Sequence, residues 1–144
     1  MIVYFISRKN KYGLTNDMEI LKSILEKNYK NIEIHFKDYR TYLTKDNVKP
    51  DINIFFETIS NIFIYEAKYN ILIPNQEYFY KSWIPYLKNI NLVLAKTKYI
   101  QTIFSQYTKT HYIGWTSLDF HNPKIRKTYK SFLHSCGNSI YKNT

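Results

Sequence analysis

A turn of small residues followed by a lysine forms a pattern that suits phosphate. The segment FLHSCGNSIYKNT (132–144) starts as an apolar, strand-like run and continues through Gly137, Asn138 and Ser139 to Lys142. Backbone N–H groups in such a turn, together with a nearby ammonium group, can bind phosphate oxygens. We therefore predict a diphosphate-binding turn at these four residues. The alternative is a loose terminal segment, as is common near chain ends.

Polar side chains also follow three apolar runs further upstream. Arg8 follows IVYFIS, Glu57 follows INIFF, and Asn75 and Glu77 follow NILIP. Amide and carboxylate groups suit sugar hydroxyls, which both donate and accept hydrogen bonds, and a basic loop suits a phosphorylated ligand. We predict that these four residues bind a ligand. The alternative is a helix cap with a first-turn acid at Asn75 and Glu77, and solvated loop side chains at the other two positions.

The other reactive residue types form no recognisable site in the sequence. His35 and His111 belong to strand-like runs, and His121 and His134 lack flanking residues typical of a metal site. Cys136, the only cysteine, has no histidine or acid at a motif spacing and fits a small strand residue better than a nucleophile. We therefore expect no metal site and no bound cofactor, and no catalytic residue is assigned.

Alternating strands and helices are needed to position these residues. Short β-branched and apolar runs predict strands near residues 2–7, 32–36, 52–56, 70–73, 92–95 and 111–114. Residues 132–136 could add another strand. This alternation predicts an α/β fold with a doubly wound, mainly parallel sheet and helices on both faces. Such sheets bind ligands beyond the carboxyl ends of their strands, which is where Arg8, Glu57 and Asn75 are expected.

Capping signals give the expected helix starts. Asn16 with Glu19 predicts a helix that begins after Asn16 and is preceded by a loop with Gly13 as its turn residue. Asn75 could cap a helix that Pro85 either kinks or delays. Thr97 is expected to cap a helix before the sixth strand, and a short segment after the third strand has weak helical character.

Composition and charge limit the class of protein. The 144 residues carry a formal net charge of +10 and 18% aromatic residues, too many for a disordered chain. The positive charge favours anionic partners, such as nucleic acid or an anionic membrane surface, although the basic residues are spread along the chain. A single cysteine and the lack of an apolar run long enough to cross a bilayer favour a cytoplasmic location.

The order of the segments resembles a known family. NILIPNQEYFYKSWIPYLKNINLVLAKTKYIQTIFSQY, then HYIGWTSLD, then FLHSCGNSIYKNT are similar to successive segments of GT-B-type glycosyltransferases of the retaining "group 1" class. The resemblance implies an acceptor-side Rossmann-like domain over residues 1–131 and the start of a donor domain over 132–144. Many members place a histidine in the loop after the fourth strand, but this chain has Pro74-Asn75-Gln76-Glu77 there.

The resemblance implies a function in sugar transfer from a nucleotide sugar to an acceptor hydroxyl. It assigns Arg8, Glu57, Asn75 and Glu77 to the sugar acceptor, and the turn at Gly137–Ser139 with Lys142 to the donor phosphates. The nucleotide sugar would be a substrate rather than a cofactor. The 144 residues alone are expected to be inactive, with a missing donor domain or a homo-oligomer completing the site. The alternative function is a basic, non-catalytic module for nucleic acid or another interaction.

Overall fold

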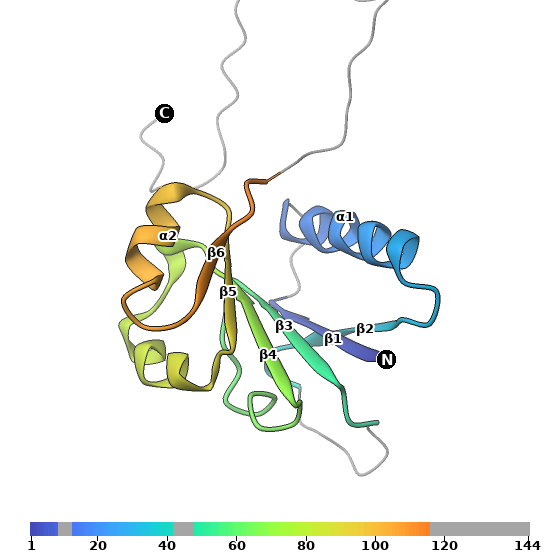
Figure 1. The fold of residues 1–144 in the computed structure, drawn as a ribbon. Helices are drawn as coiled ribbons and strands as arrows, with labels where there is room; N and C mark the ends of the chain where they lie inside the picture. Colours follow the sequence, from blue (N-terminus) through green and yellow to red (C-terminus); the bar gives the residue numbers. More distant parts are fainter. Residues whose placement is uncertain (9–12, 42–47, 116–144) are drawn as a thin grey trace, which may run out of the picture.

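The described residues are built around a six-stranded, fully parallel β-sheet (Figure 1). The computed structural model describes residues 1–8, 13–41 and 48–115. The strands are β1 (Ile2–Ser7), β2 (Glu33–Asp38), β3 (Ile52–Phe56), β4 (Tyr69–Ile73), β5 (Leu92–Ala95) and β6 (Thr110–Tyr112). Their spatial order is β2-β1-β3-β4-β5-β6, with parallel pairing throughout. The predicted Rossmann-like α/β fold is confirmed.

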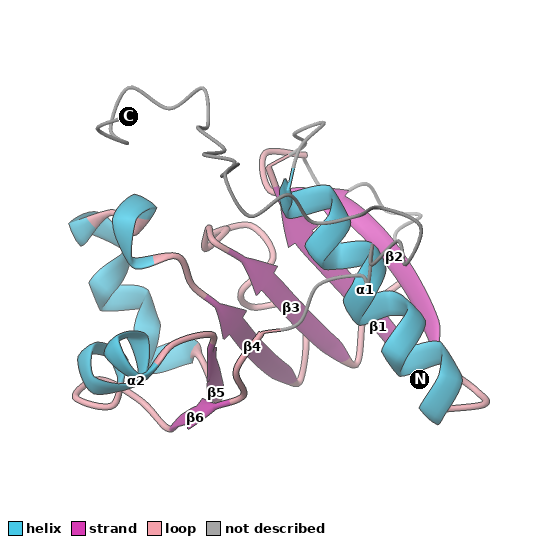
Figure 2. Ribbon diagram, turned by 90° about the horizontal axis from the view of Figure 1, so that it is seen from above, coloured by secondary structure: helices cyan, strands magenta, loops and turns pink. Residues whose placement is uncertain are grey.

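Two helices and two 3-10 segments of the described residues cover this sheet. The helices are α1 (Gly13–Asn28) and α2 (Lys98–Phe104), and the 3-10 segments are η1 (Gln76–Tyr78) and η2 (Lys81–Asn89). Among the described residues, none of these helices has the length and apolar character needed to cross a bilayer. Figure 2 shows α1 across β1 and β2, and α2 beside β5 and β6.

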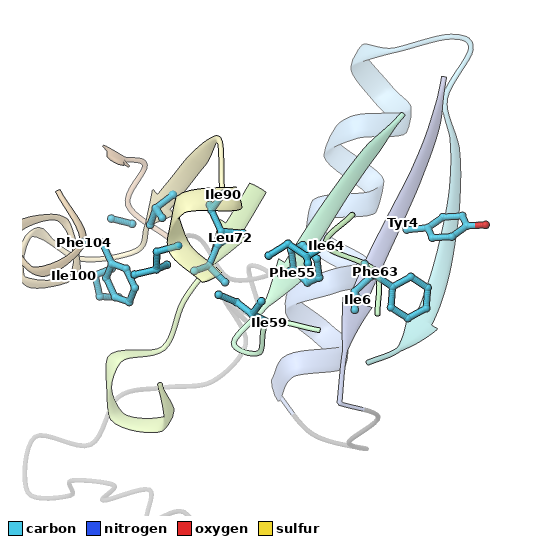
Figure 3. Packing of buried hydrophobic residues seen from close by; sticks show 13 residues of the cluster. Tyr4, Ile6, Phe55, Ile59, Phe63, Ile64, Leu72, Ile90, Ile100 and Phe104 are labelled. Atoms are coloured by element: carbon cyan, nitrogen blue, oxygen red, sulfur yellow. The ribbon is translucent and has the colours of Figure 1, made fainter. Parts of the chain in front are cut away.

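The two faces of the sheet have separate apolar cores, because successive side chains of a strand point to opposite faces. On one face, Val3 and Phe5 pack with Leu14 and Met18 of α1. The core of the other face joins all the central strands to η2 and α2 (Figure 3). Its buried residues are Tyr4, Ile6, Phe55, Ile59, Phe63, Ile64, Leu72, Leu87, Ile90, Val93, Ala95, Ile100 and Phe104. Each large side chain buried in this way contributes about 1.5–3 kcal/mol to the hydrophobic stabilisation.

A buried pair of asparagines shapes the connection between β3 and β4. Asn53 Nδ2 donates to the carbonyl of Phe63 (2.7 Å) and to Asn70 Oδ1 (3.1 Å). Asn70 Nδ2 donates to the carbonyl of Ile64 (2.8 Å). These side chains satisfy carbonyls that a helix would otherwise satisfy. The weakly helical segment after the third strand is therefore a series of turns over residues 61–66.

The predicted capping scheme needs one correction. Helix α1 begins at Gly13, so Asn16 lies inside the helix and does not cap it. The physical reason is Leu14, which is buried against the sheet one turn before Met18 and extends the apolar stripe of the helix. Thr97 does cap α2, with its Oγ1 accepting from Ile100 N at 3.1 Å, as predicted.

The helix expected after Asn75 is replaced by η1 and η2. Asn75 caps η1 by accepting from Glu77 N at 3.2 Å. The segment η2 contains Pro85 and keeps 3-10 geometry over its nine residues. Proline removes one backbone donor and clashes with the preceding turn of an α-helix, which favours the tighter, shorter-range hydrogen bonding seen here.

Candidate ligand-binding site

A pocket of about 530 Å³ lies at the carboxyl end of the sheet. Its wall combines the residues that follow β2, the turn that follows β3, and one side of η2. The lining residues are Tyr39, Arg40, Ile59, Ser60, Asn61, Ile62, Ser82, Trp83 and Tyr86. The wall thus offers aromatic rings, two hydroxyls, an amide and a guanidinium group, a mixture that small-molecule sites commonly have.

The strand order explains why a pocket forms there. The chain runs from β1 outward to β2 on one side, and from β3 outward through β4, β5 and β6 on the other. The direction of winding therefore reverses between β1 and β3, and the connections from these two strands leave on opposite faces. Open α/β sheets usually bind ligands beyond the carboxyl ends of their strands near such a point, and the pocket lies at that end, lined by residues that follow β2 and β3.

Ser60 fixes the two loops of the pocket relative to each other. Its side chain is buried, and Oγ donates to the carbonyl of Tyr39 at 2.8 Å. The same Oγ accepts from the backbone N–H of Ile62 at 3.3 Å. A single hydroxyl therefore joins the residues after β2 to the turn after β3, so that this part of the pocket wall is held in place without a ligand.

The aromatic wall is built around Trp83 of η2. Trp83 is half-buried and packs edge-on against Phe79 (5.4 Å between ring centroids) and Tyr80 (4.8 Å). Phe79 in turn packs on Phe104 of α2 at 5.0 Å. The indole is thus supported from the core side, while Trp83 and Tyr86 both line the pocket. Rigid rings of this kind present contact area at a low cost in conformational entropy.

Arg8 lies at the same edge and reaches the pocket wall through Tyr39. Its guanidinium carbon lies 5.8 Å from the centroid of the Tyr39 ring, within the range of a cation–π contact. Hydrogen bonding to the Tyr39 side chain, and more weakly to Tyr80, raises the pKa of Arg8 above its ordinary value, with burial acting in the opposite direction. Arg8 thereby links the residues after β2 to those between η1 and η2.

Glu57 and Asn75, predicted as ligand residues, lie next to each other. Asn75 Nδ2 donates to Glu57 Oε1 at 3.3 Å. Glu57 has a positive φ of 63°, which is unusual for a residue with a side chain. Its backbone N–H still donates to the carbonyl of Ile73 at 2.9 Å. Left-handed backbone costs a non-glycine residue roughly 1–2 kcal/mol, so β4 pairing holds Glu57 in a strained conformation beside the polar loop.

The remaining predicted residues are placed differently. Glu77 is exposed, and its backbone N–H is occupied by the Asn75 cap. Neither Glu57, Asn75 nor Glu77 lines the pocket. The predicted phosphate-binding turn at Gly137, Asn138, Ser139 and Lys142, together with the boundary at residue 132 and the extra strand at 132–136, lies outside the described residues.

Sequence reasoning missed most of the pocket wall. Tyr39 and Arg40 follow β2 as Arg8 follows β1. Ligands in such sheets bind beyond the carboxyl ends of the strands, so the same reasoning applied to the second strand would have predicted Tyr39 and Arg40. Trp83 both packs on Phe79 and lines the pocket. Ser60 and Asn61 carry no sequence signal, because they lie in a turn that only the buried asparagine pair defines.

Residues 1–8, 13–41 and 48–115 contain no group of three His, Cys, Asp or Glu side chains that could hold a metal ion. Comparison of the chain with protein-family models, curated proteins and solved structures gave no match. The pocket wall is therefore the feature of the described residues that bears on function.

Proposed function

We propose that this chain binds a sugar acceptor in a glycosyltransferase-like reaction, with the pocket at the carboxyl end of β2 and β3 as the acceptor site. The observation that carries the proposal is the composition of the pocket wall. A sugar ring has apolar C–H faces and hydroxyl edges. Trp83 and Tyr86 offer flat apolar surfaces for the faces, while Ser82 and Asn61 offer polar groups for the hydroxyls.

The position of the pocket supports the same proposal. The resemblance to retaining GT-B-type enzymes implies an acceptor in the first domain, bound where loops leave the carboxyl ends of its strands. A nucleotide sugar would supply the transferred group, and positive charge would stabilise the departing diphosphate. Glu57 and Asn75, held together at 3.3 Å beyond β3 and β4, would contact the acceptor from the neighbouring part of the same edge. The single cysteine supports a cytoplasmic location.

Titration of the full chain with a panel of mono- and disaccharides tests this proposal. Calorimetry and tryptophan fluorescence measure the binding. Asn61 is exposed, so Asn61→Ala should leave the fold intact and weaken sugar binding by about 1–3 kcal/mol through one unpaired hydroxyl. Asn31→Ala is the matched control, because Asn31 is also exposed but precedes β2, at the opposite edge of the sheet. Equal effects of the two variants, or no sugar response in the panel, would contradict the proposal.

A second candidate is a nucleic-acid-binding module. It is favoured by exposed tyrosine rings, among them Tyr65 (66% exposed), Tyr99 (65%) and Tyr80 (56%), on a chain with a net charge of +10. Exposed rings can stack on bases and cations can neutralise phosphates. This function predicts single-stranded DNA binding that falls steeply with salt and is indifferent to Asn61→Ala.

A further inference from the structure

Two arginine side chains lie on the same aromatic ring at the pocket wall. The guanidinium carbons of Arg8 and Arg40 are 5.8 and 5.2 Å from the centroid of Tyr39. The two arginines follow β1 and β2, which are neighbouring strands paired in parallel up to Ser7 and Asp38. The register of the sheet therefore brings two positive charges to the ring of Tyr39, a residue of the pocket wall.

The acids of the described residues compensate this pair of charges only in part. Within the described residues, Arg8 forms no ion pair, and its polar partners are the side chains of Tyr39 and Tyr80. Arg40 Nε lies 3.7 Å from Asp38 Oδ1, but the Arg40 side chain is 68% exposed. An exposed pair at that distance is weak. In this part of the chain, one carboxylate thus pairs weakly with Arg40 and none pairs with Arg8, which leaves an excess of positive charge at the rim.

The carboxylate of Asp38 has a separate role in the turn. Its Oδ1 accepts from the backbone N–H of Arg40 at 3.0 Å, which orients the residues that follow β2. Glu57, which follows β3, is hydrogen-bonded by Asn75. Neither acid forms an ion pair with Arg8 in the described part of the chain, and a negatively charged ligand group beside Tyr39 would supply a counter-charge to Arg8 and Arg40.

We infer that the ligand of the pocket carries an anionic group, a phosphate or a carboxylate, which Arg8 and Arg40 bind beside Tyr39 while Trp83 and Tyr86 contact the sugar ring. The inference rests on the proposed function for the sugar part of the ligand. Guanidinium groups suit such an anion because their planar N–H donors match two oxygens at once. The acceptor would accordingly be a sugar phosphate or a sugar acid rather than a neutral sugar.

Calorimetric titration of the full chain with glucose, glucose 6-phosphate, glucuronate and inorganic phosphate tests the inference. Two charge-assisted hydrogen bonds should make at least one charged sugar bind about tenfold or more tightly than glucose. Comparison of glucose 6-phosphate with glucuronate distinguishes phosphate from carboxylate. Arg8→Gln and Arg40→Gln should each remove most of this preference, and Asp38→Asn should increase it.

Two further variants separate a local effect from general charge and from misfolding. Lys109→Gln removes an exposed charge that precedes β6, at the amino ends of the strands. This variant should leave the preference for charged sugars unchanged. Arg8→Lys keeps the positive charge but lacks the planar pair of N–H donors. If Arg8→Gln acts by loss of binding rather than by loss of folding, Arg8→Lys should retain part of the preference for charged sugars. An equal loss in Lys109→Gln would overturn the inference.

The outcomes also separate the inference from the proposed function. If glucose and its charged analogues bind equally well, the inference that the ligand carries an anionic group is wrong, and the proposed sugar site is supported. If inorganic phosphate or single-stranded DNA binds through Arg8 and Arg40 while no sugar binds, the anion site stands and the sugar acceptor is wrong. If none of these ligands binds, both are wrong.

Discussion

At the scale of single residues, Tyr4 shows how a polar group is accommodated in the sheet core. The side chain is 2% exposed, and its hydroxyl donates to the carbonyl of Val48. Its ring also packs edge-on against Phe63 at 6.2 Å and His35 at 5.6 Å. Burial raises the pKa of Tyr4, with a smaller contribution from the charge of Glu33. The neutral phenol is therefore favoured in the folded state.

This pKa shift predicts a loss of stability in alkali. The folded state holds the phenol proton more tightly than the unfolded chain, whose tyrosines ionise near pH 10. The contribution of Tyr4 is therefore complete below about pH 10 and is lost as the pH rises through the higher folded-state pKa. Urea unfolding at about pH 8 and about pH 11 should show a smaller alkaline loss for Tyr4→Phe than for the wild type. Tyr29→Phe, at a 55% exposed position, should match the wild type.

The pocket at the residue scale depends on a few bridging side chains. Ser60 joins two loops through one hydroxyl, and Arg8 lies over the ring of Tyr39. Each bridge connects residues that are far apart in the sequence. Substitutions at these positions should therefore change the shape of the ligand site more than the stability of the sheet.

At the scale of elements, α2 is short and depends on its cap. It has seven residues and packs through Ile100 and Phe104. Four backbone N–H groups at its start have no partner inside the helix, and Thr97 Oγ1 accepts from one of them. A helix this short gains little from its own hydrogen bonds, because nucleation is costly. The cap and the two buried side chains therefore hold it on β5 and β6.

Two threonines of this region should respond to alanine in opposite directions. Thr97→Ala should lower the free energy of unfolding by about 1 kcal/mol through the lost cap. Thr102→Ala should leave it unchanged or raise it by about 0.5 kcal/mol, because Thr102 is exposed, its hydroxyl only bonds back to the carbonyl of Lys98, and alanine is the better helix former. Chemical denaturation of both variants measures the difference. A destabilisation of equal size in both would show that threonine packing, not capping, matters here.

At the scale of the whole molecule, one cluster joins elements that lie far apart in the sequence. Lys96 Nζ lies 2.5 Å from Asp17 Oδ2, and Trp115 Nε1 donates to Asp17 Oδ1 at 3.1 Å. The Lys96 ammonium also lies 4.2 Å from the centroid of the Trp115 ring. The cluster connects α1 to the residues that follow β5 and β6. It holds α1 against the sheet on the face that α2 does not cover.

A double-mutant cycle of Asp17→Asn and Lys96→Met should give a coupling energy of about 1–2 kcal/mol. The side chains of this pair are only 19% and 23% exposed, so water screens their interaction weakly. Lys22 and Glu26 on α1 provide the comparison, since that pair is 3.9 Å apart and more exposed. Its coupling should be about 0.3–0.5 kcal/mol. Equal coupling in the two cycles would refute a special role for the Asp17 cluster.

Local sequence patterns determined the elements of this protein. All six predicted strands are present, and their limits differ from the predicted ones by at most two residues. The caps at Thr97 and Asn75 were also predicted. Unbroken apolar runs can only be buried in a sheet covered on both faces, and a cap involves residues two or three positions apart, so both signals are contained in short stretches of chain. The start of α1 was missed because burial of Leu14, a tertiary contact, extends the helix.

The tertiary structure alone decided where the pocket lies. The sequence pattern predicted that Arg8, Glu57 and Asn75 follow the ends of strands. It did not predict that β1 lies between β2 and β3. That order brings Arg8 onto Tyr39, 31 positions along the chain, and puts the turn with Ser60 beside both, while Glu77 stays outside. The physical reason is that strand order depends on the sum of many long-range packing contacts. The residues next to a single polar residue in the sequence do not determine those contacts.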